Sequence, residues 1–218
     1  MVAAIQSHAF TGQVPGITTI AVTKPTGLSA GELIFVYVDS NSLATTWTAP
    51  DATWNTIAGS PTSAGFWKYA GTSEPSTWTF TRGTTTGAEV AVAVRVSGAG
   101  SPTVSSQDPR GSASTVAFAS MLVATSGSLS LHMGSCLGGD LAGVTAPGGV
   151  TEYADGVLGF VGYEAVSPSA TTARTWTSDG GAKNIGGMAV IIPPAAVPSA
   201  FGRIKITYKA NNTFTVPT

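Results

Sequence analysis

The feature that most constrains the fold of this chain is an internal repeat, in which the second half follows the pattern of the first about 96 residues later. The matching segments are GELIFVY (31–37) with GSLSLHM (127–133), TAPD (48–51) with TAPG (145–148), FWKYA (66–70) with VGYEA (161–165), WTFT (78–81) with RTWT (174–177), and the closing apolar runs 90–96 and 188–192. Such a repeat is too long for a solenoid unit and too short, with so little charge, for an obviously independent domain. We therefore predict two half-sandwiches that share one core.

The hydrophobic pattern predicts an all-β protein. Period-two alternation and β-branched runs, bounded by Gly, Pro, Asn and Asp, extend from end to end of the chain. Residues 33–39 are nearly all apolar, which is typical of a strand covered on both faces. Many short strands with turn signals between them favour an antiparallel β-sandwich or jelly roll, with one Greek key in each repeat-related half.

The same pattern predicts the domain boundaries. The sandwich is expected over residues 1–194, with halves at about 14–99 and 112–194 and a long turn-rich connection between them. Prolines make residues 195–200 an extended linker, because they restrict φ and remove hydrogen-bond donors. Residues 201–218 are expected to form a C-terminal extended arm that contains one further strand.

Composition restricts the function classes. Only 10% of the 218 residues are charged and the net charge is -1, which argues against nucleic-acid binding as a main task. The single cysteine, Cys136, cannot form a disulfide within the chain. The N-terminus lacks a signal-peptide pattern and no window has 18 consecutive apolar residues, so we expect synthesis in the cytoplasm, no secretion signal and no membrane span.

The charges are distributed unevenly along the chain. All eleven acidic residues and six basic residues lie before residue 180, and the other four basic residues follow it. The C-terminal arm has two distinct faces in an extended strand, with Ile204, Ile206 and Tyr208 on one and Arg203, Lys205 and Lys209 on the other. A lone strand cannot satisfy its own backbone groups, so we expect this segment to be a docking arm that joins another sheet edge.

A search for chemistry finds one cluster of suitable residue types: His132, Cys136 and Asp140. Positions four apart on a strand share a face but lie about 13 Å from one another, too far for shared ligation. His8 is the only other histidine in the chain. A Ser-His-Asp catalytic triad is therefore not indicated by the sequence. The acids are scattered without a calcium loop, and a glycosidase carboxylate pair has no motif behind it. We predict no catalytic site, no metal site and no cofactor.

Five tryptophans raise the alternative of glycan binding. Two aromatic pairs, Trp67 with Tyr69 and Trp78 with Phe80, alternate with polar residues as in a sandwich core. Trp47 and Trp54 flank the turn at residues 48–51 and are the candidates for an exposed ligand-binding pair.

Several segments together resemble a β-sandwich module of tailed-bacteriophage virions. They are the GEL strand start with its apolar strand (31–39), the WTAP turn (47–50), the W-x-T-I segment (54–57) and the aromatic strand leading into AGTSEPSTWTFT (70–81). The likeness covers about residues 14–193. The chain departs from the pattern at residues 31–32, where Gly-Asp is common, and at 46–48, where Gly-Trp-Thr is common. The ending NTFTVP (212–217) is similar to the start of glycine-rich modules in phage tail and fibre proteins.

The resemblance implies a structural, non-enzymatic protein of the virion. We expect a head-decoration or minor capsid protein that docks through its arm onto other virion proteins and copies of itself. The alternatives are a minor tail or tail-fibre protein with an adhesive role, and a carbohydrate-binding module that binds a host-surface glycan.

Overall fold

The computed structural model describes residues 2–12, 18–40, 46–60, 62–83, 89–137, 143–156, 159–179 and 183–196. Within these ranges the regular elements are the strands β1 to β18, all paired antiparallel. The predicted antiparallel all-β sandwich is therefore confirmed. The docking arm and most of the linker lie outside the described residues.

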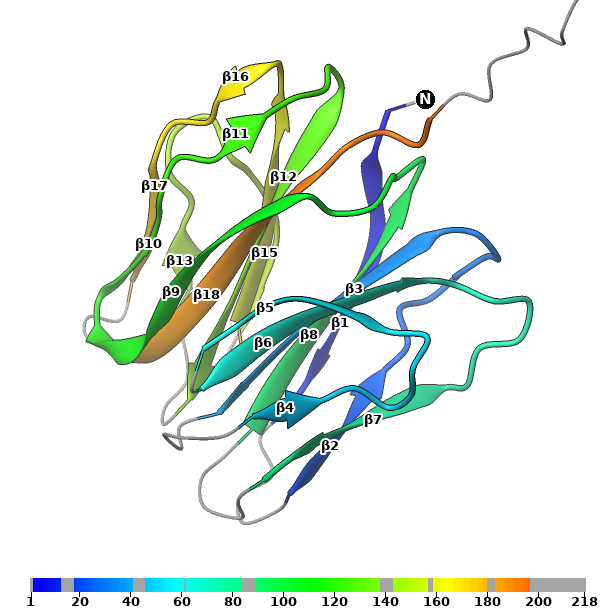
Figure 1. Cartoon of the computed structure of the whole chain (residues 1–218). Helices are drawn as coiled ribbons and strands as arrows, with labels where there is room; N and C mark the ends of the chain where they lie inside the picture. The colour runs from blue at the N-terminus through cyan, green and yellow to red at the C-terminus, as the bar shows by residue number, and fades with distance from the viewer. Residues whose placement is uncertain are drawn as a thin grey trace, which may run out of the picture.

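The first half contains a five-stranded sheet in the order β1-β8-β3-β6-β5 and a three-stranded sheet in the order β2-β7-β4 (Figure 1). The strand bounds are β1 Ala4–Thr11, β2 Thr19–Thr23, β3 Leu33–Ser40, β4 Trp47–Thr48, β5 Asn55–Gly59, β6 Ser63–Tyr69, β7 Thr77–Arg82 and β8 Glu89–Ser97. The small sheet covers the outer face of the large one, so this half is a sandwich with an interior of its own.

The second half contains a five-stranded sheet in the order β14-β15-β12-β18-β9, a three-stranded sheet in the order β10-β17-β13 and the short pair β11-β16. The bounds are β9 Val104–Ala113, β10 Thr115–Phe118, β11 Leu122–Val123, β12 Ser128–Leu137, β13 Val144–Thr145, β14 Thr151–Gly156, β15 Gly159–Val166, β16 Ser169–Ala170, β17 Arg174–Ser178 and β18 Lys183–Ile192. It too has a small sheet over the outer face of a large one.

The two halves have the same strand connectivity once β11 and β16 are set aside. Reading each large sheet from its first strand gives β1-β8-β3-β6-β5 in one half and β9-β18-β12-β15-β14 in the other. The small sheets correspond in the same way, strand for strand. This shared order favours the predicted repeat relationship of the halves, which stays a prediction together with the jelly-roll description.

The expected boundaries of the halves need correction. The first half begins with β1 and not near residue 14, because β1 pairs with β8 at the edge of the large sheet. The second half begins with β9, which pairs with β18 and occupies much of the segment expected to be a turn-rich connection. Non-local pairing overrides the local turn signals there, and residues 98–103 make the connection.

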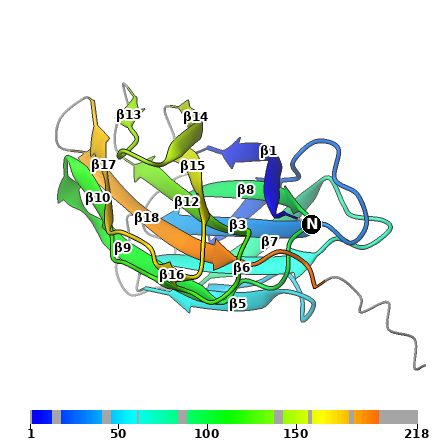
Figure 2. The same cartoon turned by 90° about the horizontal axis from the view of Figure 1, so that it is seen from above.

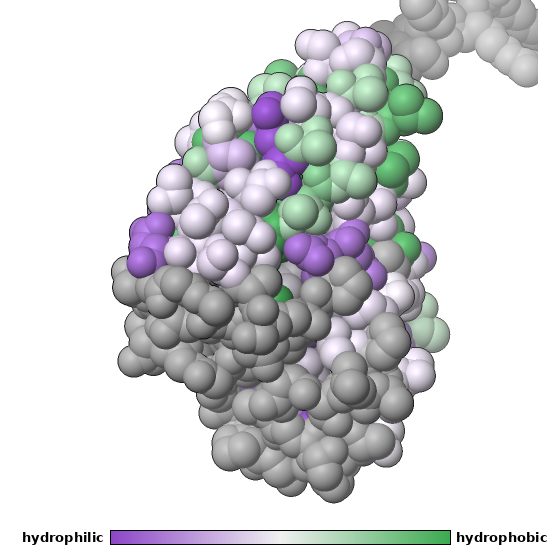
Figure 3. Space-filling view, turned by 90° about the vertical axis from the view of Figure 1, so that its left-hand side faces the viewer, coloured by the Kyte–Doolittle hydropathy of each residue, from purple (hydrophilic) through white to green (hydrophobic). Residues whose placement is uncertain are grey.

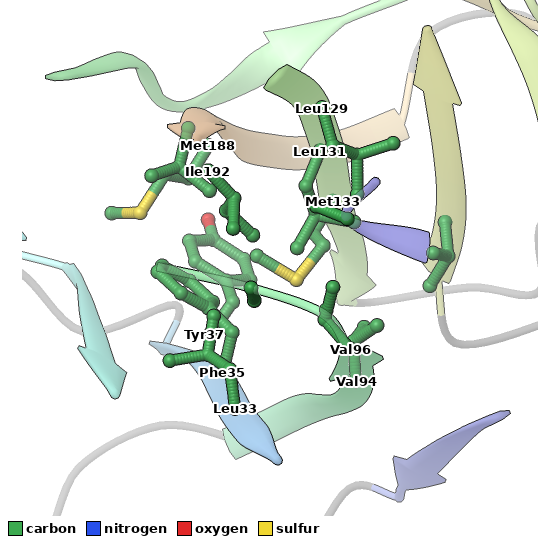
Figure 4. Close-up of a cluster of buried hydrophobic side chains, with 14 of the residues drawn as sticks. Leu33, Phe35, Tyr37, Val94, Val96, Leu129, Leu131, Met133, Met188 and Ile192 are labelled. Atoms are coloured by element: carbon green, nitrogen blue, oxygen red, sulfur yellow. The ribbon is translucent and has the colours of Figure 1, made fainter. Parts of the chain in front are cut away.

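The two five-stranded sheets pack face to face and bury a shared apolar layer between the halves (Figures 2 and 4). The side chains of Leu33, Phe35 and Tyr37 from β3 point toward those of Leu131 and Met133 from β12, and all five are fully buried. β8 and β18 supply the flanking residues Val92, Val94, Val96, Met188, Val190 and Ile192. The halves are thus held together by an interface with the character of a protein core.

Each half also has a second core between its own large and small sheets. In the first half it contains Val36, Trp78 and Phe80, and in the second half Phe118, Phe160 and Trp176. The prediction that the halves share one core is therefore incomplete, since the chain has three apolar layers. Strand β3 contributes alternate residues to two of them, as its uninterrupted apolar sequence predicts.

A polar contact crosses the shared layer near its end. Ser135 Oγ of β12 donates a hydrogen bond to Asp39 Oδ2 of β3 at 2.5 Å, and Tyr37 Oη donates to the same oxygen at 3.0 Å. Asp39, Ser135 and Tyr37 are fully buried. Because a buried carboxylate is costly unless its lone pairs are satisfied, this contact fixes how one sheet lies on the other.

We expect residues 1–99, expressed alone, to self-associate or aggregate, although this fragment retains its inner core. The fragment would expose the apolar face that β12 and β18 cover in the whole chain, and exposed patches of this kind drive association. Size-exclusion chromatography with light scattering, together with dye binding to exposed apolar surface, measures this. A monomeric fragment that unfolds cooperatively would contradict the shared-layer interpretation.

We expect Leu131→Ala to lower the free energy of unfolding by about 2–5 kcal/mol, because it leaves a cavity in the shared layer. The matched control is Leu122→Ala, since Leu122 is 75% exposed and its truncation should change stability by less than about 0.5 kcal/mol. Urea denaturation of the two variants checks the difference. Equal losses at the two positions would be inconsistent with the packing described.

Candidate functional site

The two tryptophans expected to form an exposed ligand-binding pair are buried. Trp47 is 6% exposed and Trp54 is 7% exposed, and both belong to the inner core of the first half. The expectation is wrong because the intervening turn folds back onto the sandwich. The Asp51 carboxylate accepts hydrogen bonds from the backbone N–H and the hydroxyl of Thr53, and this closes the turn.

Tertiary contacts hold the two indole rings in place. Trp47 Nε1 donates to the carbonyl oxygen of Thr62 at 3.1 Å. The Trp54 ring packs edge-on against Trp78 and Phe80, with centroid separations of 5.4 and 5.2 Å. The Lys68 ammonium lies 5.1 Å from the Trp54 ring centroid, which is a cation–π distance.

The other aromatic expectations are met in part. Trp78 and Phe80 are core residues, as predicted. Trp67 is partly buried against the shared layer, whereas Tyr69 is 42% exposed and is not a core residue. The parity of the strand places Trp67 and Tyr69 on one face, but Tyr69 lies at the end of β6, where the cover of the opposing sheet stops.

His132 is buried in the second half, and its ring is held by two neighbours. Trp176 Nε1 donates a hydrogen bond to His132 Nδ1 at 3.3 Å, so Nδ1 is the unprotonated nitrogen. Nε2 carries the proton and donates to Ser130 Oγ at 2.9 Å. In a serine nucleophile site the histidine accepts the hydroxyl proton, and here the direction is reversed. The geometry is that of a histidine whose ring is fixed by core neighbours.

The electrostatic surroundings also keep His132 neutral. Burial, and then the charge of Arg174, lower the pKa of His132 to about 3. Glu164 Oε1 lies 3.8 Å from His132 Nε2 but is held by Arg174, whose Nη2 donates to Glu164 Oε2 at 2.6 Å. A neutral imidazole does not form an ion pair with this carboxylate.

The structure describes only part of the other two members of this candidate cluster. Cys136 lies in β12, where its backbone pairs with that of Ile185 in β18. Asp140 lies outside the described residues. Among the residues that the structure describes, no group of three or more His, Cys, Asp or Glu side chains could hold a metal ion.

The Glu164–Arg174 pair borders a small surface hollow of about 180 Å³. Its other walls include Ser167, Ser169 and Thr171 from the segment around β16. The first half has an ion pair at the corresponding position of its large sheet, where Lys68 and Glu74 approach to 2.7 Å. Each pair lies beside a buried tryptophan, so we interpret both as contacts that fasten a surface turn to its sandwich.

The strand β14 lies at the edge of the second large sheet and carries a group of exposed charged side chains. The four edge strands β1, β5, β9 and β14 each pair with one neighbour in their own sheet, and each also lies near a strand outside it: β1 near β2, β5 near β9, β9 near β10, and β14 near β1. In the described structure β14 pairs only with β15, and a bulge at Tyr153 interrupts this pairing. A bulge and charged side chains are the devices by which an open edge is kept from indiscriminate pairing.

One face of β14 is acidic. Glu152, Asp155 and Asp179 are exposed and lie together, and we call them the acidic face. The Asp155 and Asp179 carboxylates converge on Gly143, where an added Cβ would lie 3.3 Å from Asp155 Oδ2 and 2.9 Å from Asp179 Oδ2. Partial burial, and then the charges of Asp155 and Asp179, raise the pKa of Glu152.

The opposite face of β14 is aromatic. Tyr153 packs edge-on against His8 of β1 with ring centroids 5.6 Å apart, and lies 6.4 Å from Tyr163 of β15. Phe10 contacts the other side of His8 at 5.1 Å. These four residues form an aromatic seam where β1 and β14 approach each other at one side of the molecule (Figure 2). Tyr153 is 37% exposed, so the seam is open to solvent.

Sequence reasoning missed this edge. The clustering of Glu152 and Asp155 in a chain with few charges is the local signal that could have marked it. Asp179 belongs to the acidic face because β13 pairs with β17. The spacing of acidic residues in the sequence does not indicate this. The coloured part of the face drawn in Figure 3 is largely of intermediate hydropathy, with separate hydrophilic and hydrophobic patches.

No family model matches the chain, and neither a curated protein nor a solved structure shows significant similarity to it. The described part of the chain includes no helix that is long and apolar enough to cross a membrane.

We expect stability to fall as the pH is lowered from about 6.5 toward 3, because His132 binds a proton in the unfolded chain over this range but not in the folded one. For one such group the slope approaches about 1.4 kcal/mol per pH unit. The variant His132→Gln should lose this component of the pH dependence. The comparison variant is His8→Gln, at a half-buried position.

Urea denaturation at a series of pH values measures both variants. A pH dependence in His132→Gln equal to that of the unaltered chain would contradict the neutral, buried state of this ring.

Proposed function

We propose that the chain is a non-enzymatic structural protein on the surface of a tailed-phage virion, with a head-decoration or minor capsid role. One observation carries the proposal. The body presents an open, charged sheet edge at β14, and the same chain carries an amphipathic basic segment over residues 203–209 that is suited to sheet edges. The sequence resemblance to virion β-sandwich modules supports the same role.

The packing is also suited to a structural role. Three apolar layers and a buried polar contact between the halves make a body in which the sheets have little freedom to move. His132, the described residue with the most catalytic potential, has both ring nitrogens bound by core neighbours. These are features of a stable building unit.

We place the adhesive tail or fibre role second, and a carbohydrate-binding module third. The expectation of glycan binding depended on Trp47 and Trp54 being exposed. Both are buried, so this support for glycan binding is lost. The head-decoration role needs no such platform, because it requires a docking segment and a stable body.

We expect deletion of residues 199–218 to leave the melting temperature of the purified protein nearly unchanged and to abolish its attachment to phage particles. All three cores lie within residues 3–192, so the deletion removes no core contact. The measurements are thermal unfolding and immunoblotting of density-gradient fractions of particles produced with either form of the chain.

The full-length chain should sediment with the particles and the truncated chain should stay at the top of the gradient. If the full-length chain is found only in soluble fractions, the virion role is wrong. If the truncated chain still sediments with particles at full occupancy, the body and not the arm makes the attachment.

A further inference from the structure

The free edge of β14 has two faces of different chemistry, and they match the two faces of the C-terminal segment. The acidic face carries Glu152, Asp155 and Asp179, and the aromatic seam carries Tyr153 and its neighbours. Asp155 accepts a hydrogen bond from the backbone of Val144 in the small sheet, so the acidic face lies toward that sheet. The seam lies on the opposite side, toward β1.

Residues 203–209 read RIKITYK, with basic residues at three of the four alternate positions, Thr207 at the fourth, and Ile204, Ile206 and Tyr208 between them. A strand with this pattern that lies along β14 directs all its basic side chains to one face of the sheet and its apolar side chains to the other. In one of the two orientations about the strand axis, Arg203 and Lys205 meet the acidic face while the apolar residues extend the aromatic seam.

We propose that residues 203–209 of one copy of the chain add as a strand to the edge of β14 in a second copy. Main-chain hydrogen bonds to the edge provide affinity, and the match of the two faces selects the orientation. The inference rests on the proposed structural role and names the partner of the arm as another copy of this chain.

The place where the described chain ends favours a second copy over the arm's own body. The Ala195 N–H donates to the Gly98 carbonyl oxygen at 2.7 Å, so the chain leaves beside the connection between the halves. In Figure 2 this exit lies on the side of the molecule away from β14. A strand that leaves one body in this direction and pairs with the next body makes a head-to-tail contact, which can repeat around a ring or along a lattice.

The charges on both partners make the pairing selective. The acidic face keeps unrelated strands from the open edge of β14, in the way that charged edges limit aggregation, and the basic face of the arm offsets that repulsion. Exposed charge pairs of this kind are screened by salt, so the association should weaken as ionic strength rises.

The test is sedimentation equilibrium of the full chain, of residues 1–198, and of edge variants of the full chain. We expect concentration-dependent association of the full chain and a monomer for residues 1–198. The double variant Glu152→Gln with Asp155→Asn should weaken association by about tenfold, equivalent to about 1.4 kcal/mol. The matched control is Thr77→Lys with Thr79→Lys, which changes the net charge equally on exposed positions of β7 and should associate as the full chain does.

Charge exchange distinguishes a specific pairing from a general charge effect. A chain with Glu152→Lys and Asp155→Lys should not associate by itself, and a chain with Arg203→Glu and Lys205→Glu should not either. The chain that carries all four changes should recover association. Hydrogen exchange should show slower exchange at the β14 amides in the associated full chain than in residues 1–198, and unchanged melting temperatures confirm that the variants fold.

The inference is overturned if the full chain stays monomeric at all concentrations, if residues 1–198 associate equally, or if the edge variants associate as the full chain does. It is also overturned if the four-change chain fails to recover. The proposed function fails independently, when the full-length chain does not sediment with phage particles. Attachment to particles through the arm without self-association would refute this inference and leave the virion role standing.

Discussion

The packing of one five-stranded sheet on the other is the interaction on which the rest of this structure depends. It requires a close approach, since a Cβ added to Gly65 would lie 2.5 Å from Met188 Sδ of the other half. β3, β8 and β18 each have one face in this layer and their other face in the inner core of their own half, and the other face of β12 carries the buried polar residues Ser130 and His132. These strands are therefore buried on both sides, and the packing of the large sheets covers the faces that the small sheets do not.

Buried charges define the ends of the layers. Arg82 forms an ion pair with Glu89 inside the first half, and burial raises the pKa of Glu89 against the opposing effect of Arg82. Asp39 accepts a hydrogen bond across the shared layer from Ser135. Such groups are weak sources of net stability, but each is costly to leave without a partner. Apolar packing alone would permit several alignments of the sheets. We interpret these polar contacts as the ones that select a single alignment.

The surface follows from the same arrangement. The body has few charges, so its contact with water depends on hydroxyl and backbone groups. The backbone groups at the edges of its sheets are the ones most able to pair with another strand. Each edge strand pairs with one neighbour in its large sheet, and β14 is distinguished among them by its acidic face and the aromatic seam. The docking role proposed for this protein would centre on such an edge, where backbone groups can pair with another strand.

The sequence by itself determined the strand content, the double burial of β3 and the core positions of Trp78 and Phe80, because period-two alternation records which residues share a face. It also indicated the correspondence of segments between the halves. Only the tertiary structure decided what covers each face. The sequence places Trp47 and Trp54 beside a turn, and tertiary packing buries them. It also indicates a connection where β9 pairs with β18. Asp179 is brought near β14 by the small sheet. Contacts between segments far apart in the chain decide these outcomes, and no local pattern contains them.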